Sequence, residues 1–330
     1  MTIFLPGEKP RVLVTAPGPR SDELIHSLLG QGATVTVEST RPDPRLLDLA
    51  SRGLVQIQAS CDRDEFDVVV RDRRDTVTAP TGSTVTGVGR VILVGGGPGN
   101  LGLLTLAGLE AIRDADVLVC DRLAPLSVLD QARPGTEIIH VGKIPRGEFT
   151  PQDTIDALLV DRARRGATVV RLKGGDGYVF GRGGEEWNAC IENGIPVSVI
   201  PGVSSALAVP ALAGIPLTHR ALAQGFVVVT GHLSPSDPRS EVDWKALAAL
   251  GLTIVILMGV AALDEIVRTL VQAGMSPDTP AACIADGGMA SMRTVRAGLA
   301  DLPEQARHAG LTAPAITVIG AVVDALTPQR

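Results

Sequence analysis

Short apolar runs and amphipathic stretches alternate along most of the chain. After Arg90 the apolar runs are rich in Val, Ile and Leu, and between them apolar residues recur every three or four positions. The predicted strands are RVILVG, ADVLVC, EIIHVG, ATVVRL and PVSVIPG, and the predicted helices lie at about 103–113, 151–165, 183–193 and 204–213. Strand–helix alternation at this spacing predicts a mainly parallel sheet.

The pattern changes after AGIPLTHR. Here the predicted strands are GFVVVTG, LTIVILMG, AACIAD, RTVRAGL and AITVIG, with a helix at about 261–273. The last three strands follow one another too closely for a helix between each pair, which favours a mixed sheet. The sequence therefore predicts two α/β lobes, residues 90–220 with a parallel sheet and residues 221–330 with a mixed one.

A further α/β segment precedes these lobes. RVLVTA, ATVTVES and DEFDVVV are predicted strands, and two helices lie between them, the first capped by Ser21. This pattern predicts a small Rossmann-like domain over residues 1–75, but its first turn, TAPGPRSD, contains a single glycine, Gly18, and lacks G-x-G-x-x-G. Residues 76–89 are rich in Thr, Gly, Ser and Pro and are predicted to form a linker.

Composition excludes several kinds of partner. A net charge of −6 and 2% aromatic residues argue against nucleic-acid binding. No apolar run is long enough for a signal peptide or a membrane span. The histidines and the four cysteines lack metal-ligand spacing, so no metal site is predicted. Well-separated cysteines without C-x-x-C suit reduced thiols, and we therefore expect a cytoplasmic protein with no membrane partner.

The first glycine loop, in VILVGGGPGNLG, has two interpretations. Gly97-x-Gly99-x-x-Gly102 follows a strand, and Asp121 lies one strand later, which formally matches the fingerprint of an NAD-dependent dehydrogenase. Pro98 argues against that interpretation, because it removes one N–H from a loop whose donors would hold phosphate.

Two later segments also suggest a ligand site. RLKGGDGYVFGRGGEEW holds six glycines in the eleven residues 174–184, around Asp176 at the carboxyl end of a predicted strand. Glu185 and Glu186 fall in the first turn of the next helix, where acidic residues are favoured. In VIPGVSSALAVPALAGIPLTHR, either serine after Gly202 is placed to cap a helix.

Taken in order, the blocks LVGGGPGNLGLLTLAGL, ADVLVCDRL, HVGK, VVRLKGGDGYVFGRGGEE, IPGVSSALAVPALAGIPLTHR, VVTGH, LMGV and TAPAITVIG resemble the uroporphyrinogen-III C-methyltransferases. These belong to the tetrapyrrole (class III) S-adenosylmethionine methyltransferases, and the resemblance runs from Arg90 to the C-terminus. It implies a two-lobed tetrapyrrole methylase fold, S-adenosyl-L-methionine as cofactor, S-adenosyl-L-homocysteine as its product, and a homodimer.

The resemblance also implies roles for individual residues. The implied cofactor-binding residues are Pro98, Gly174, Gly175, Asp176, Val179, Ser204, Ser205, Met258, Gly287, Ala313 and Pro314. Asp121 matches a proton acceptor and Lys143 a proton donor, although a simple pair of Asp121 with Arg122, and a Lys143 that binds a substrate carboxylate, remain open alternatives. The implied substrate-binding residues are Arg146, Phe180, Arg182 and Arg220.

The implied reaction is methylation of uroporphyrinogen III at C2 and C7 to give precorrin-2, in siroheme or cobalamin biosynthesis. A later corrin precursor is the alternative substrate, and a catalytically silent relative is a further alternative. Asn100, Gly177-Tyr178 and Glu148 depart from the family pattern, which usually has Asp, Pro-Phe and His there. The first segment resembles a shortened NAD-binding domain of siroheme synthase, or a fragment similar to uroporphyrinogen-III synthase, and we hypothesise that its NAD binding is lost.

Overall fold

Two compact units, Met1–Ser83 and Thr84–Arg330, divide the chain. The computed structural model describes residues 10–15, 21–30, 32–42, 44–71, 87–141 and 150–326. Most of the segment predicted as a linker, together with Lys143, Arg146 and Glu148, lies outside these residues.

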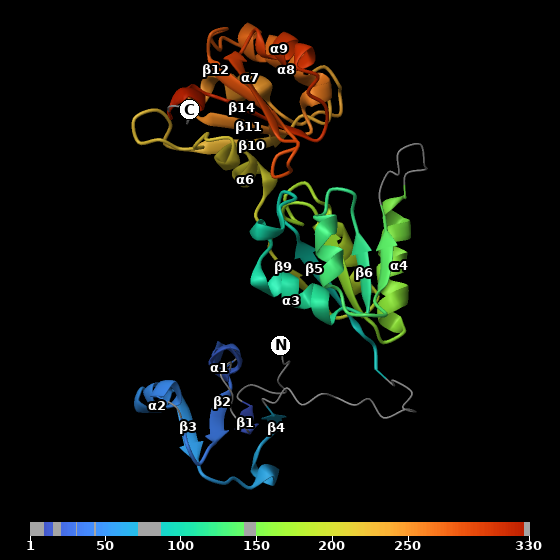
Figure 1. Cartoon of the computed structure of the whole chain (residues 1–330), viewed down its shortest axis with the longest axis vertical. Helices are drawn as coiled ribbons and strands as arrows, with labels where there is room; N and C mark the ends of the chain where they lie inside the picture. The colour runs from blue at the N-terminus through green and yellow to red at the C-terminus, as the bar shows by residue number, and fades with distance from the viewer. Residues whose placement is uncertain are drawn as a thin grey trace. The chain divides into compact units, whose positions relative to one another are not determined.

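The first unit contains a four-stranded parallel sheet with strand order β3-β2-β1-β4. The strands are β1 (Arg11–Thr15), β2 (Thr34–Glu38), β3 (Val55–Gln58) and β4 (Val68–Arg71), and the helices are α1 (Ser21–Gly30) and α2 (Pro44–Ser51) (Figure 1). Apolar residues of the strands pack against Ile25 and Leu28 of α1 and Leu46 and Leu49 of α2. The sheet order and the parallel strands confirm the predicted Rossmann-like α/β segment.

The second unit begins with a five-stranded sheet in which every pairing is parallel, with order β7-β6-β8-β5-β9. Its strands are β5 (Arg90–Gly95), β6 (Val117–Cys120), β7 (Glu137–His140), β8 (Thr168–Lys173) and β9 (Val197–Ile200). The alternation of side chains along the strands builds a core on each face. The parallel sheet predicted from strand–helix alternation is confirmed.

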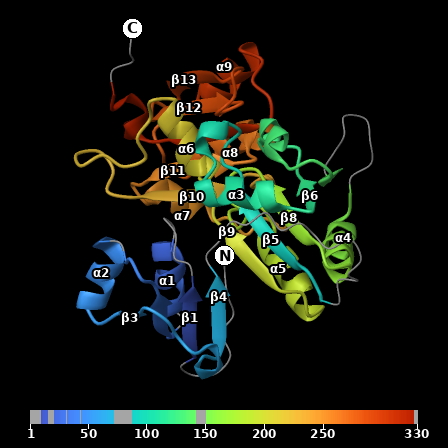
Figure 2. The same cartoon turned by 60° about the horizontal axis from the view of Figure 1, so that its bottom comes forward.

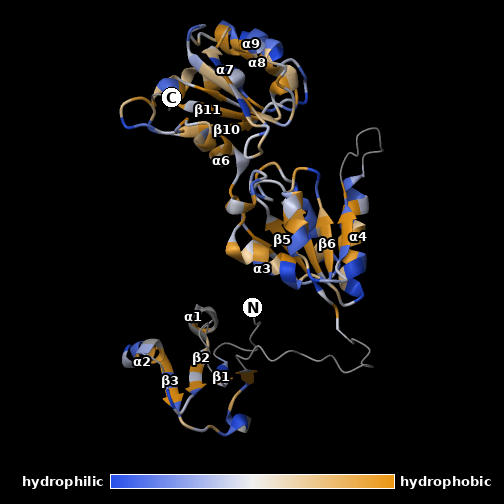
Figure 3. Cartoon of the chain, in the orientation of Figure 1, coloured by the Kyte–Doolittle hydropathy of each residue, from blue (hydrophilic) through white to orange (hydrophobic). Residues whose placement is uncertain are grey.

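Helices cover both faces of this sheet. Val91, Val119 and Val169 point toward α4 (Gln152–Arg164) and α5 (Gly183–Glu192), while the intervening residues Ile92, Leu118 and Val170 pack against α3 (Leu106–Asp114) (Figure 2). The basic end of α4 is a solvated helix terminus, where Arg162 pairs with Glu137 and Asp161. Figure 3 shows the same division, with apolar strands and polar outer helix surfaces.

A second sheet, with order β10-β11-β14-β12-β13, follows in the same unit. Its strands are β10 (Phe226–Thr230), β11 (Thr253–Leu257), β12 (Pro280–Ala285), β13 (Arg293–Gly298) and β14 (Ala315–Ile319). Strands β10 and β11 are parallel and the other pairings are antiparallel, so the predicted mixed sheet is confirmed. One face packs against α7 (Trp244–Ala249), α8 (Leu263–Gln272) and α9 (Leu302–His308).

Helix α6 (Ser205–Leu212) connects the two sheets by its packing. It follows β9 of the first sheet, yet Ala206 and Val209 pack with Val255 of β11 and Ile316 and Val318 of β14 in the second. Figure 1 shows α6 beside β10. The chain therefore leaves the first sheet before α6 begins.

Two helices of the second sheet region were not predicted. Helix α7 is short, and its capping Asp243 follows a polar segment without a clear period. Helix α9 occupies the connection between β13 and β14, where Pro303 sits in its first turn and the buried Leu302 and Ala306 face the core. A short amphipathic segment of this kind carries too few periodic positions to be recognised from one sequence.

Burial makes three of the four thiols unreactive. It raises the pKa of Cys120 and of Cys190 to about 11 and also raises that of Cys283, so at pH 8 they are protonated. Cys61 is partly exposed, although burial and the nearby Glu38 raise its pKa as well. We expect Ellman's reagent at pH 8 to modify Cys61 slowly in the native protein and the other three after unfolding. Fast labelling of a Cys61→Ser variant would contradict this burial.

Candidate active site

Three loops at one edge of the first sheet contact each other through backbone atoms. Because the strands are parallel, the loops that follow β5, β8 and β9 leave from the same edge. The Gly97 and Gly175 backbones exchange two hydrogen bonds, with N···O distances of 3.1 and 2.7 Å, and the Gly96 N–H donates to the Lys173 carbonyl at 2.7 Å. The first and second glycine motifs therefore form one site.

This close approach requires residues without a Cβ. A Cβ on Gly202 would lie 2.3 Å from the Gly175 carbonyl oxygen, and one on Gly95 would lie 2.4 Å from the Gly202 nitrogen. A Cβ on Gly174 would lie 2.5 Å from the Leu123 carbonyl oxygen in the loop after β6. Such distances are well inside van der Waals contact, so packing alone requires glycine at these three positions.

The hydrogen bonds of the first loop argue against a dinucleotide fingerprint. The N–H groups of Gly96 and Gly97 are already bonded to the β8 loop, and Pro98 has none. A pyrophosphate in the usual Rossmann position needs free backbone donors at this turn. The Gly97 loop therefore offers fewer free backbone donors than the dehydrogenase interpretation needs.

Asp176 connects two of the loops. Its Oδ1 accepts from the Tyr178 N–H at 2.8 Å and its Oδ2 accepts from the Gly202 N–H at 3.1 Å. The side chain is partly buried, and each oxygen keeps further acceptor capacity. The two serines that follow Gly202 lie next to this loop. Ser204 caps α6, and Ser205 Oγ is 3.2 Å from the position that a Cβ on Gly175 would take.

The predicted residues of the second sheet lie together at one edge. Met258 directly follows Leu257, which pairs with Ile316 of β14, so it lies beside the start of that strand. The Asp286 N–H donates to the Pro314 carbonyl at 3.0 Å, which places the Gly287 turn next to the Ala313–Pro314 peptide. Met258, Gly287, Ala313 and Pro314 therefore share this edge.

The second-sheet edge contacts the first glycine loop. The Cβ position of Gly288 lies 3.0 Å from the Pro98 carbonyl oxygen, and that of Gly99 lies 3.4 Å from the Met289 side chain. The 286–289 turn thus joins Pro98 and Gly287 in one region. The structure brings most of the predicted cofactor-binding residues to the line where the two sheets meet.

Backbone strain is concentrated around the same region. Among the described residues, four non-glycine positions have positive φ: Phe180 (53°), Arg182 (59°), Met258 (58°) and Asp286 (52°). Left-handed backbone is unfavourable for these residues, and such strain gathers at binding and catalytic sites. Three of the four were predicted as site residues, and Asp286 adjoins Gly287.

Asp121 stands at the carboxyl end of β6 and is ion-paired. Its Oδ1 accepts from Arg171 Nη2 at 2.5 Å, and its Oδ2 lies 3.6 Å from Lys173 Nζ. Asp121 therefore pairs with Arg171 and Lys173 of β8, and not with Arg122 as the alternative interpretation suggested. The Asp121 side chain is 30% exposed, so it is open to solvent on one side. A proton-acceptor role for Asp121 stays a prediction.

Behind Asp121 lies a buried charge network that the sequence did not reveal. Glu186 Oε1 accepts from Arg171 Nε at 2.8 Å and from Lys173 Nζ at 3.0 Å. Burial disfavours the charged form of Arg171, but the carboxylates of Asp121 and Glu186 outweigh burial and raise the pKa of the guanidinium. Two charged residues alternating with apolar ones in VVRLKGG were the available signal for such a network.

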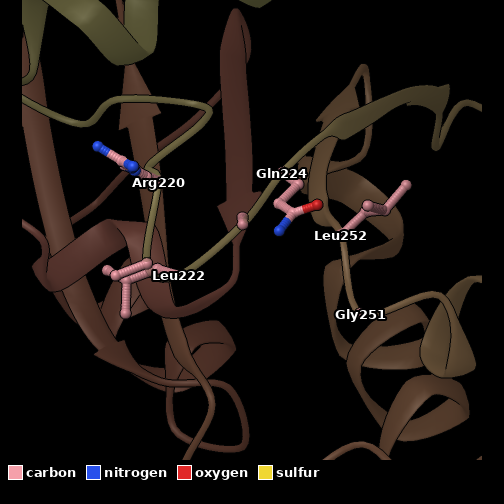
Figure 4. A pocket seen from close by; sticks show the side chains of 7 residues that line it. Arg220, Leu222, Gln224, Gly251 and Leu252 are labelled. Atoms are coloured by element: carbon pink, nitrogen blue, oxygen red, sulfur yellow. The ribbon is translucent and has the colours of Figure 1, made fainter.

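The predicted substrate-binding residues are dispersed. Arg182 forms a two-point ion pair with Glu185, at 2.9 and 2.6 Å, in the exposed first turn of α5, and Phe180 is half exposed beside it. Arg220 lies at the amino ends of β10 and β11, away from Met258 at the carboxyl end of β11. It lines a cavity of about 300 Å³ with Leu222, Gln224, Gly251 and Leu252 (Figure 4). Lys143 and Arg146 fall outside the described residues.

Within the described ranges, no cluster of three or more His, Cys, Asp or Glu side chains is arranged to hold a metal ion. Across those same residues, no helix is long and apolar enough to cross a membrane.

Known proteins share this architecture. Residues 90–303 match the family of Tetrapyrrole (Corrin/Porphyrin) Methylases. The chain is 45% identical over 242 residues to the uroporphyrinogen-III C-methyltransferase of Methanocaldococcus jannaschii, which covers 73% of this chain and 99% of that relative. A crystal structure of uroporphyrin-III C-methyltransferase from Thermus thermophilus, complexed with S-adenyl homocysteine, superimposes with a TM-score of 0.62. It shares 39% identity and covers 72% of this chain and 100% of that one.

A longer relative matches the same region. The siroheme synthase of Neisseria meningitidis is 49% identical over 235 residues, which is 71% of this chain and 48% of that protein. The chain thus spans about half the length of this curated relative. The remaining part of the relative falls outside the match.

Proposed function

The chain belongs to the tetrapyrrole (corrin/porphyrin) methylases, and from this we propose that it is a uroporphyrinogen-III C-methyltransferase that uses S-adenosyl-L-methionine. The proposed reaction methylates C2 and C7 to give precorrin-2. One observation carries the proposal: the glycine loops after β5, β8 and β9 contact one another, the first of them contacts the 286–289 turn of the second sheet, and Asp121 stands at the end of β6 on the same edge of the first sheet.

The cofactor site proposed here is a cradle with few side chains. Gly174 and Gly175 add no side chain to the site, while Asp176 offers acceptor capacity for a ribose hydroxyl or an amino group. The half-exposed apolar side chains of Val179 and Met258 suit an uncharged adenosine surface next to a sulfonium. S-adenosylmethionine supplies the activated methyl group. The protein therefore has to align the acceptor carbon with it and needs no nucleophile of its own.

The acceptor ring gains positive charge as its carbon attacks, and it must then lose a proton. Asp121 can stabilise that charge and accept the proton, because its carboxylate is partly exposed at the sheet edge. Lys143 is proposed as the proton donor. We propose that Arg146, Phe180 and Arg182 bind the substrate, whose peripheral carboxylates suit arginine forks. Arg220 lies at the opposite end of β11 from Met258 and is therefore not part of this set. The exposed Arg182–Glu185 pair can exchange one carboxylate for another at small cost.

Further properties are proposed on more limited support. The second unit exposes large apolar side chains at Leu106, Leu207 and Leu212, and such exposed apolar surface favours a homodimer. Four free cysteines favour the cytoplasm, where thiols stay reduced. The product can feed siroheme or cobalamin biosynthesis. A later corrin precursor remains the second candidate substrate within this family.

Calorimetry followed by a product assay tests the proposal. We expect S-adenosylhomocysteine to bind with micromolar affinity, and we expect NAD to give no measurable heat of binding to the protein. Anaerobic incubation with uroporphyrinogen III and labelled cofactor should give a product heavier by two methyl groups in mass spectrometry. Tight binding of NAD with no methylated product would support the dehydrogenase alternative, and cofactor binding without turnover would support a silent relative.

A further inference from the structure

Three buried charged side chains lie behind Asp121, and the methyl-transfer scheme above gives them no role. The exposed fractions of the side chains are 2% for Arg171, 4% for Lys173 and 0% for Glu186. Burying charges is costly unless they are paired, and replacing a buried ion pair by apolar residues is often neutral or stabilising. Stability alone therefore does not explain this network.

The network is directed toward Asp121. Arg171 and Lys173 are two positions apart on β8, so both side chains project from the same face of the sheet. Helix α5 packs on that face and supplies Glu186, while Asp121 directly follows the neighbouring β6 and its N–H donates to the Leu172 carbonyl at 3.1 Å. Each cation therefore lies between one carboxylate on α5 and one at the sheet edge.

We propose that Glu186 is a positioning residue for Asp121, acting through Arg171 and Lys173. One oxygen of Glu186 accepts from both cations, and each cation then faces a different oxygen of Asp121. This arrangement orients the Asp121 carboxylate and balances the positive charge behind it. The inference rests on the proposed function, because it assigns Asp121 a proton to accept.

Charge balance is the part of this arrangement that can be measured. Two cations face two carboxylates, so Glu186 offsets positive charge that would otherwise favour the anionic form of Asp121. The other titratable or charged neighbours of Glu186 are Asp156, Cys190 and Arg182, and the Cys120 thiol lies close to Asp121 and Arg171. Burial and then Glu186 contribute to a raised pKa of Asp156, and burial holds the Cys190 thiol neutral. These groups stay in place in the variants described next.

Two substitutions should move the pH profile in opposite directions. In Glu186→Gln, both cations act on Asp121 alone, so the acid limb of the single-turnover methylation rate should shift to lower pH by about one unit. In Lys173→Gln, Asp121 loses a cation, so the limb should shift to higher pH by about one unit. The double variant Glu186→Gln/Lys173→Gln restores the balance of charges and should return the limb close to its original position.

The controls separate positioning from structural damage. Glu192→Gln removes an exposed carboxylate from the same helix and should leave the profile unchanged. S-adenosylhomocysteine affinity shows whether each variant has a folded site. Loss of stability alone would leave the acid limb of both variants in place, or would shift it in the same direction in both. Opposite shifts in the two variants therefore require the electrostatic link to Asp121.

The outcomes also distinguish this proposal from the proposed function. If the unaltered enzyme methylates uroporphyrinogen III with a clear acid limb and neither folded variant shifts it, the positioning role is refuted and the activity stands. If the unaltered enzyme forms no methylated product, the proposed function itself fails. Should one variant fail to fold, the other still predicts a shift of defined sign.

Discussion

Asp121→Asn is expected to lower the single-turnover rate of methylation by about 10²-fold or more, with binding of S-adenosylhomocysteine retained. The amide keeps the shape of the side chain but cannot accept the proton that the acceptor ring releases, and general-base catalysis contributes about 10²–10⁴-fold. The Asp121 side chain also lies outside the backbone contacts that connect the glycine loops, so the cofactor site should stay intact. Rapid-quench assays and calorimetry measure the two quantities.

Asp114→Asn is the matched control for this experiment. Asp114 is an exposed carboxylate at the end of α3 in the same lobe. Its amide variant should have the unaltered rate. An Asp121→Asn enzyme that binds the cofactor product normally and methylates at the unaltered rate would show that Asp121 is merely an ion-pair partner of Arg171.

Gly202→Ala should destabilise the protein by about 2–3 kcal/mol and lower the affinity for S-adenosylhomocysteine by about tenfold or more. The new methyl would stand 2.3 Å from the Gly175 oxygen and 2.5 Å from the Gly95 carbonyl carbon, and backbone atoms cannot rotate away as side chains do. The loops after β5, β8 and β9 must then move apart. Urea unfolding and calorimetry measure the two effects.

Gly184→Ala, in the first turn of α5 of the same lobe, provides the comparison. A Cβ at Gly184 meets no atom within 4 Å, and alanine is favoured over glycine in the first turn of α5. We expect this variant to be more stable by about 0.5–1 kcal/mol and to bind normally. Equal effects of the two substitutions would mean that backbone contact at Gly202 has no special importance.

Hydrophobic periodicity predicted most of the architecture. Strands β5, β6, β8 and β11 are mostly buried and rich in Val, Ile and Leu, and such runs are recognisable because their side chains must fill a core on both faces of the sheet. The same rule could not find α9, whose seven residues give too short a pattern. Nor could it show that α6 packs on the second sheet, because periodicity identifies an apolar face without its partner.

Sequence reasoning located the site through its glycines. Dense glycine around Asp176 indicated a ligand loop, and the family resemblance joined it to Met258 and Pro314 across more than eighty residues. It did not predict that the Glu186 side chain is buried. The position of Glu186 in the first turn of α5 suggested instead that it serves the positive end of the helix dipole. The pairing of Glu186 with Arg171 and Lys173 depends on β8 and α5 lying face to face, which is a tertiary fact.

The placement of α6 has a practical consequence for protein engineering. By sequence order this helix completes the first lobe, but its apolar side chains interdigitate with β11 and β14 of the second. A chimera assembled from two related enzymes should therefore be joined ahead of Ser204, so that α6 travels with the C-terminal partner it evolved against. A junction at Arg220 would instead combine a helix from one parent with a sheet from the other.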